Sequence, residues 1–313
     1  MKTFKCFLVL IALFFIYTNA YSQGNETLAE KLGYSKDAKL LILHADDAGV
    51  SHSEDSATIA AFEKKAINSA SIMVPCPWFP EIAAYAKAHP ELDWGIHLTL
   101  TAEWKNYKWG GVSSSDKISS LLDKNGYLYS SVEEFTRHAK SEEVETELRA
   151  QIEKAMSFGI KITHLDNHMG SILGSPVFIK IYQKLGKEYN LPVLIPMNMI
   201  RLMAPQMLQY LDTGNIIVDQ FTSAYKAVPA EKWNEFYNQA IQNLKPGLNE
   251  IIFHLAFNDN EMKAITIDHP DFGAEWRQND FNYVTSEEFK NLLKKDDIHL
   301  ITWGDIQKTL KQQ

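Results

Sequence analysis

Short apolar runs alternate with amphipathic segments along most of this chain, and this alternation restricts its fold more than any other feature. The runs are almost continuously apolar, which is typical of strands that are covered on both faces of a parallel sheet. The predicted strands are Lys39–His44, Ser71–Val74, Trp94–Leu100, Ile160–Leu165, Pro192–Pro196, Ile216–Val218, Ile251–Leu255 and Ile298–Trp303. Strands that alternate with helices in this way build α/β folds.

The segments between these runs have the apolar spacing and the end signals of helices. The predicted helices are Ala57–Lys65, Phe79–Ala88, Ser141–Met156, Val177–Tyr189, Pro205–Leu211, Ala230–Leu244, Ser286–Leu293 and Asp305–Lys311. At a length of 313 residues, this repetition favours a closed (β/α) barrel over an open sheet. We therefore expect an α/β fold, a barrel with seven or eight parallel strands, in a single domain that spans residues 23–313.

Residues 1–22 have the three-part pattern of a secretory signal peptide. Lys2 and Lys5 give a basic start, residues 7–17 form an apolar stretch that is short for crossing a bilayer, and small residues follow. An uncleaved membrane anchor is the alternative, while Cys6 lies on the wrong side of the apolar stretch for a lipoprotein attachment. We expect export, periplasmic or secreted, with no membrane insertion after cleavage.

Charge and cysteine content argue against several other classes of protein. The formal net charge of −8 becomes −10 when Lys2 and Lys5 are lost with the signal peptide. Such a chain repels polyanions, and no basic run with interleaved aromatics offsets this, so we expect no nucleic-acid partner. Cleavage also leaves Cys76 as the single cysteine, which can form no internal disulfide, so a large core has to stabilise the fold.

Two segments interrupt the rhythm of strands and helices with clusters of aromatic residues. Residues 101–140 follow the strand that contains His97 and include Trp104 and Trp109, and residues 268–282 are similar. Sugar rings stack on exposed aromatics in loops, so a carbohydrate subsite is one interpretation. The other is a surface insertion whose aromatics pack against one another, and both stay open on the sequence.

Carboxylates and imidazoles lie at or near the ends of several predicted strands. Asp46 and Asp47 follow the first strand directly, and neighbouring side chains there point in different directions, so one could bind a metal ion while the other faces a substrate. By itself, such a pair is more often a solvated turn or a helix cap. His97 lies between apolar residues, where a histidine is more often part of the core than a ligand, although Gly95 permits close approach.

The segment from His164 to His168 carries a sharper signal, because three potential ligands occur within five residues. His168 is the preferred ligand, and His164 is expected to support the site. A metal-bound imidazole needs a carboxylate or carbonyl on its second nitrogen, a role open to Asp166 or Asp46. One carboxylate with two imidazoles suits a catalytic zinc ion with open positions and tolerates other divalent metals.

Three motifs, in this order, resemble the YdjC-like family of carbohydrate deacetylases, which includes the chitooligosaccharide deacetylases. The motifs are His44-Ala45-Asp46-Asp47-Ala48-Gly49, Gly95-Ile96-His97-Leu98 and Thr163-His164-Leu165-Asp166-Asn167-His168. The resemblance extends from about Lys39 to the C-terminus.

This resemblance implies a deformed (β/α) barrel, a divalent metal ion, and removal of acetyl groups from N-acetylated sugars. The family's metal ligands correspond to Asp47, His97 and His168, its catalytic base to Asp46, and a late histidine to His254. Zinc is favoured, and magnesium or another divalent ion is compatible. The ion would polarise the acetyl carbonyl and acidify water, Asp46 would take the proton of the water, and His254 would give a proton to the leaving nitrogen.

The chain departs from the usual pattern of that family in two places. Met169-Gly170-Ser171 follow His168 where relatives often have further histidines, and His254 is followed by Leu255-Ala256 where Pro-Gly is usual. The three proposed ligands are unaffected. The departures bear on substrate choice and on the role of His254.

Other functions fit the same residues. An esterase acting on O-acetyl groups, or another metal-dependent hydrolase, would use the same activated water. A non-catalytic, exported glycan-binding barrel would keep these residues for structural reasons, against the penalty for burying unpaired polar groups. A serine hydrolase is disfavoured because no Gly-x-Ser-x-Gly occurs, and Cys76 has no nucleophile signature around it. The expected partner is an acetylated sugar or oligosaccharide, and a homodimer is compatible with the sequence.

Overall fold

The computed structural model describes residues 26–212, 217–225, 228–294 and 297–310. The predicted signal peptide, residues 1–22, lies outside these ranges and stays a prediction. Within the described ranges, no helix combines the length and the apolar character needed to cross a membrane.

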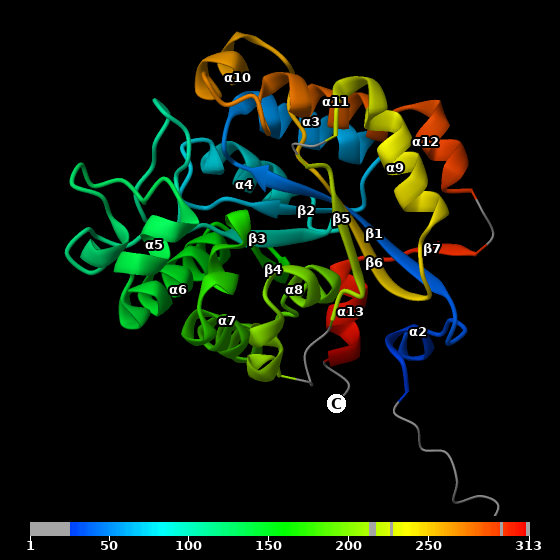
Figure 1. The fold of residues 1–313 in the computed structure, drawn as a ribbon, viewed down its shortest axis with the longest axis horizontal. Coiled ribbons are helices and arrows are strands. Elements are labelled where there is room, and N and C mark those ends of the chain that lie inside the picture. The colour runs from blue at the N-terminus through cyan, green and yellow to red at the C-terminus, as the bar shows by residue number, and fades with distance from the viewer. Residues whose placement is uncertain (1–25, 213–216, 226–227, 295–296, 311–313) are drawn as a thin grey trace, which may run out of the picture.

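A seven-stranded parallel sheet forms the centre of the molecule (Figure 1). The strands are β1 (Lys39–Ala48), β2 (Ser69–Ile72), β3 (Trp94–Leu98), β4 (Ile162–Asn167), β5 (Gln220–Ser223), β6 (Gly247–Phe253) and β7 (Ile298–Leu300). Their order in space is β4-β3-β2-β1-β6-β5, and β7 pairs with the first residues of β1. Every pair of these strands is parallel, so their carboxyl ends meet at one side of the sheet.

Isolated bridges connect the two outer strands of this sheet. Leu165 in β4 forms a parallel bridge with Val193, and Pro196 forms one with Val218, which lies two residues before the start of β5. The strands are thereby linked into a ring. The predicted α/β fold with seven parallel strands is confirmed, but the segment Pro192–Pro196 contributes only bridges where a strand was expected.

Helices cover the strands on both sides. They are α2 (Leu28–Lys31), α3 (His52–Glu63), α4 (Phe79–Ala88), α5 (Val132–His138), α6 (Ser141–Ser157), α7 (Pro176–Tyr189), α8 (Met197–Met203), α9 (Trp233–Gln242), α10 (Asn260–Ile265), α11 (Ala274–Val284), α12 (Glu287–Leu292) and α13 (Trp303–Leu310). Figure 1 shows α3, α9, α11 and α12 on one side and α6, α7, α8 and α13 on the other. Short 3-10 helices are η1 (Ser119–Leu121), η2 (His168–Gly174), η3 (Pro205–Tyr210) and η4 (Ala230–Lys232).

Other predicted elements differ from the observed ones in the second half of the chain. The helix expected at Pro205–Leu211 is the 3-10 helix η3, and the helix expected at Ala230–Leu244 begins with the 3-10 turn η4 before α9. Of the strand expected at Ile216–Val218, Ile216 lies outside the described residues. The strand forms instead at β5, which is only half-buried and therefore has no continuous apolar run to reveal it.

β1 is the central strand of the sheet, and it is buried along almost its entire length. It pairs with β2 near its carboxyl end, with β6 along most of its length, and with β7 near its amino end. Leu41 and Leu43 pack into one apolar cluster and Leu40 and Ile42 into another, so neither face of this strand is exposed to water. This burial explains the continuous apolar run that follows Lys39.

The ring of His164 on β4 packs tightly between two neighbours inside the fold. Its plane stacks on the indole of Trp303 with ring centroids 5.2 Å apart. On β3, a Cβ added to Gly95 would lie 2.3 Å from His164 Nε2, a distance that no side chain tolerates. The absence of a side chain at Gly95 is therefore what makes room for this buried imidazole.

We expect Gly95→Ala to destabilise the fold by roughly 1–3 kcal/mol, the usual penalty for overpacking a core. The same substitution in a His164→Ala background should cost less, because the clashing ring is gone, with a coupling of about 0.5–3 kcal/mol. Urea unfolding of the two single variants and the double variant measures this coupling. Equal penalties in both backgrounds would show that the Gly95–His164 contact does not limit packing.

Candidate metal centre

Asp46 and Asp47 lie at a bulge near the carboxyl end of β1. The pairing between β1 and β2 shifts register between Ala45 and Ala48, and Asp47 has a φ of 68°. Bulges redirect side chains, and a left-handed backbone is uncommon for residues other than glycine. The irregular backbone therefore turns the two neighbouring carboxylates toward different partners.

Asp47, His97 and His168 converge at the carboxyl ends of β1, β3 and β4. Asp47 Oδ1 lies 3.3 Å from His97 Nε2 and 3.2 Å from His168 Nδ1. One potential ligand atom from each residue lies within 4.8 Å of the other two. The structure thus brings together the three residues that the sequence analysis selected as ligands.

The oxygen at the centre of this group lacks a conventional partner. Asp47 Oδ1 is buried and accepts no hydrogen bond from any described residue. Burying a carboxylate oxygen without a hydrogen-bond partner destabilises the fold. The atoms that face this oxygen are His97 Nε2 and His168 Nδ1. One carboxylate oxygen facing two imidazoles is a donor set that a divalent cation such as zinc fits.

Carboxylates contact the other ring nitrogens of the two histidines. His97 Nδ1 lies 2.8 Å from Asp166 Oδ1, and His168 Nε2 lies 3.0 Å from Glu103 Oε2. These contacts leave His97 Nε2 and His168 Nδ1 free to face Asp47. Carboxylates on the second nitrogen orient a ligating imidazole and increase its basicity, so Asp166 fills the role expected of it, and Glu103 is an additional residue of the same kind.

Arg277 completes the surroundings of Asp47. Its guanidinium donates to Asp47 Oδ2 at 2.8 Å and to Glu54 Oε1 at 2.5 Å, and the arginine is itself buried. Burial tends to raise the pKa of Asp47, but the charge of Arg277 and the two facing imidazoles of His168 and His97 outweigh burial and hold the pKa well below its usual range. Asp47 is therefore an anion at the pH values at which proteins work.

The two imidazoles respond to the same negative charge. Burial lowers the pKa of His168, but the carboxylates of Glu103 and Asp47 outweigh burial and raise it to about 9. The pKa of His97 is also raised, because Asp166 and Asp46 outweigh the effect of burial. Without a cation, protons on these rings balance the carboxylates, and a divalent ion would take over that charge.

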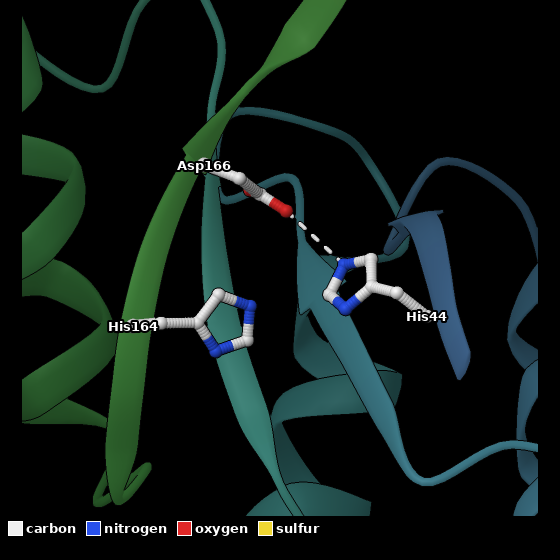
Figure 2. A group of neighbouring side chains, drawn as sticks. All are labelled: His44, His164 and Asp166. Atoms are coloured by element: carbon white, nitrogen blue, oxygen red, sulfur yellow. Dashed lines mark ion pairs between the residues drawn. The ribbon is translucent and has the colours of Figure 1, made fainter. Parts of the chain in front are cut away.

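His44 connects the carboxylate of Asp46 to that of Asp166. Its Nε2 lies 3.1 Å from Asp46 Oδ1 and 3.1 Å from Asp166 Oδ2, and Figure 2 shows the second of these contacts. Its Nδ1 lies 2.8 Å from Ser69 Oγ. Burial lowers the pKa of His44, but the nearby carboxylates of Asp166 and Asp46 outweigh burial and raise the pKa to about 10. A protonated His44 thus fixes Asp46 beside the candidate metal centre.

His164 takes no direct part in this centre. In Figure 2 its ring projects from β4 beside His44, but no ion pair joins it to His44 or Asp166. Burial and the nearby charge of His44 hold the pKa of His164 well below its usual value. One potential ligand atom each of His164, His44 and Asp166 lies within 4.8 Å of the other two, so His164 packs against residues behind the candidate metal centre, and its supporting role stays a prediction.

His254 follows β6 and reaches toward Asp46. Its Nε2 lies 3.9 Å from Asp46 Oδ2, and its backbone N–H donates to Asp280 Oδ2 at 2.9 Å. Burial lowers the pKa of His254 to about 4. The ring is therefore neutral at pH 7, so it has to receive a proton before it can donate one.

A sequence model of the family described as "YdjC-like protein" matches residues 40–295. The chain belongs to the YdjC-like family. A carbohydrate deacetylase of Thermus thermophilus is 30% identical over 288 residues, which cover 90% of this chain and 99% of the relative. A carbohydrate deacetylase of Thermoanaerobacter pseudethanolicus is 28% identical over 232 residues, which cover 74% and 86%.

A crystal structure supports the fold of this YdjC-like protein. A proposed cellobiose-phosphate cleavage protein of Enterococcus faecalis V583 superposes with a TM-score of 0.72 at 23% identity. The superposition covers 86% of this chain and 99% of the other. This similarity shows that the two proteins share the arrangement of strands and helices.

The aromatic segments of this YdjC-like protein contribute differently from what their composition suggests. Trp104 and Trp109 are almost fully buried, with ring centroids 5.7 Å apart, so these two pack in the interior and offer no exposed platform for a sugar. The same segments supply Glu103, behind His168, and Arg277, behind Asp47. Sequence reasoning missed both charged residues, because neither belongs to a motif and both lie in segments that were singled out only for their aromatic residues.

We expect Arg277→Leu to destabilise the metal-free protein by about 3–5 kcal/mol, because it leaves buried carboxylates without their counter-charge. Arg137→Leu is the matched control, since Arg137 forms an exposed pair with Glu133 and its loss should cost about 0.5 kcal/mol or less. Urea unfolding at neutral pH measures both. Similar stability losses for the two variants would refute the structural importance of the buried pair.

Proposed function

We propose that this protein is a metal-dependent hydrolase that removes acetyl groups from N-acetylated sugars or oligosaccharides. The observation that carries the proposal is the convergence of Asp47, His97 and His168, with the separate carboxylate of Asp46 next to them. Membership of the YdjC-like family, with relatives named carbohydrate deacetylases, supports the substrate class.

The three converging side chains would hold the cation through Asp47 Oδ1, His97 Nε2 and His168 Nδ1. Two nitrogen donors favour zinc, because magnesium prefers oxygen ligands, although another divalent ion is compatible with the set. A cation held there supplies Lewis acidity, which polarises the scissile carbonyl and makes water easier to deprotonate.

Asp46 is the proposed general base. His44 holds one of its oxygens, Oδ1, and the other, Oδ2, faces His254. A carboxylate fixed in this way can take a proton from the attacking water without reorienting. We infer that Asp46 is a reacting group, while His44 is a residue that positions it.

His254 is the proposed donor to the leaving nitrogen. Because burial keeps its ring neutral, it cannot hold this proton in the resting state. We infer that the proton taken by Asp46 passes from Oδ2 to His254 Nε2, which then delivers it to the amine as the C–N bond breaks. The protein thus moves one proton from the water to the leaving group.

Asp46→Asn should lose about 100- to 10,000-fold in turnover while the metal stays bound. Asp47→Ala, His97→Ala and His168→Ala should instead lose the metal, since each removes one ligand. Elemental analysis and acetate release from N-acetylated chitooligosaccharides separate the two phenotypes, and chelation of the wild type should abolish turnover until zinc is restored. Equal metal content in all four variants contradicts this division of roles.

The choice of bond is tested with matched substrates. The same preparation is assayed on an O-acetylated xylooligosaccharide, because an esterase would use the same residues on an ester. Faster release from the O-acetylated substrate would replace the amidase assignment by an esterase one. Release from neither substrate by the metal-loaded protein would favour a glycan-binding role.

Export is proposed from residues 1–22 alone. Expression of the full chain in a bacterial host should give a mature protein outside the cytoplasm whose N-terminus lies near residue 23. Leu13→Arg, which interrupts the apolar stretch, is the control and should leave the protein in the cytoplasm. An intact N-terminus on the exported protein would indicate an anchor instead.

A further inference from the structure

A cavity of about 340 Å³ lies beside the proposed base, bordered by residues of β4, α8 and β5. Asp46, His97, Asp166 and Asn167 form its polar end. The rest of this apolar cavity plays no part in the proton transfers described above. Its size lies in the range of about 300–1,000 Å³ that small-molecule pockets occupy.

The walls of the apolar cavity offer almost no hydrogen-bonding groups. Beyond the polar end, its lining includes Leu173, Leu194, Met199, Ile200, Met203 and Phe221. A sugar ring would bring several hydroxyl groups into this space, and each would lose its hydrogen bonds to water without replacement. The apolar cavity therefore fits a hydrocarbon group and is unsuited to a further sugar unit.

An acetyl group alone would leave most of the apolar cavity unfilled. Its methyl group takes up on the order of 30 Å³, about the share of one water molecule in the liquid. Unfilled apolar space forfeits contacts that a longer chain would make. A chain of several carbons uses the space that an acetyl group leaves.

The residues at the polar end of the cavity indicate on which side of the scissile bond the hydrocarbon group lies. Asp46, which would take the proton of the water that attacks the carbonyl carbon, lines the apolar cavity, whereas His254, the proposed donor to the leaving nitrogen, does not. The apolar cavity therefore extends from the acyl side of the bond. A hydrocarbon group on the sugar side would have to leave through the region of His254.

Methionines give this wall the capacity to adapt. Met199 and Met203 come from α8, and Met169 comes from the turn directly after His168; Met203 is 72% exposed and Met169 46% exposed, so both border the open part of the cavity. Met169 has a φ of 55°, and its Sδ accepts a hydrogen bond from Thr101 Oγ1 at 3.4 Å. Methionine is flexible and polarisable, so such a wall can close around hydrocarbon chains of different length.

We propose that the apolar cavity is an acyl-chain pocket, and that N-acylated amino sugars with chains longer than acetyl are better substrates than the acetylated ones. The inference rests on the proposed function, because it keeps the same bond and the same reacting residues. Water adds to the amide carbonyl, the C–N bond breaks, and the nitrogen takes up a proton. The products are a carboxylate and a free amine, whatever the length of the chain.

The test is a series of chitobiose derivatives acylated on nitrogen with acetyl, propionyl, butyryl or hexanoyl groups, assayed by release of free amine. Each buried methylene should raise kcat/KM about fourfold, so butyryl should exceed acetyl by about 15-fold. Met199→Trp, which fills the apolar cavity, should remove this preference. Leu202 lies on the same helix but is 79% exposed and does not line the cavity, so Leu202→Trp should keep the preference for longer acyl chains.

The outcomes separate this inference from the proposed function. Release of acetyl groups that is equal to or faster than release of longer chains overturns the acyl-chain pocket and leaves deacetylation in place. A parallel arm varies an alkyl aglycone on the N-acetylated sugar, and a preference that follows the aglycone also overturns it. Failure to release any acyl group by the zinc-loaded, folded protein overturns the proposed function and this inference together.

Discussion

The buried negative charge of Asp47 is the constraint around which the rest of the site is arranged. A carboxylate removed from water is tolerated only when its neighbours supply positive charge or donors. Arg277 does so at one oxygen, and the imidazoles of His97 and His168 face the other. This orientation requires a strained left-handed backbone at Asp47, and the surrounding contacts maintain that conformation.

Groups of alternating charge extend outward from that carboxylate. Behind His97 stands Asp166, and behind Asp166 stands His44, which also holds Asp46. Each member contacts the next, so the side chains of the candidate site are held in place without a ligand. The positions of Asp46 and of the candidate ligands are therefore not independent, because Asp166 and His44 link them.

The sequence predicted those parts of the molecule that depend on local patterns. The apolar run of β1 and the residues at its end follow from burial and from parallel topology, which brings carboxyl ends together. Glu103 and Arg277 reach the site from segments outside the strands, and nothing in their own neighbourhood reveals what they touch. β5 also escaped prediction, since a half-buried strand has no continuous apolar run. Burial of Trp104 is likewise a property of the whole fold.

The pairing of β1 determines when this site can form during folding. β1 lies early in the chain, but its neighbours β6 and β7 come from the last quarter. Contacts between such distant segments close large loops, which makes assembly slow in comparison with local structure. The strand that carries both aspartates acquires its full set of partners only once residues near 300 have been synthesised, so the candidate metal centre depends on a segment far along the chain.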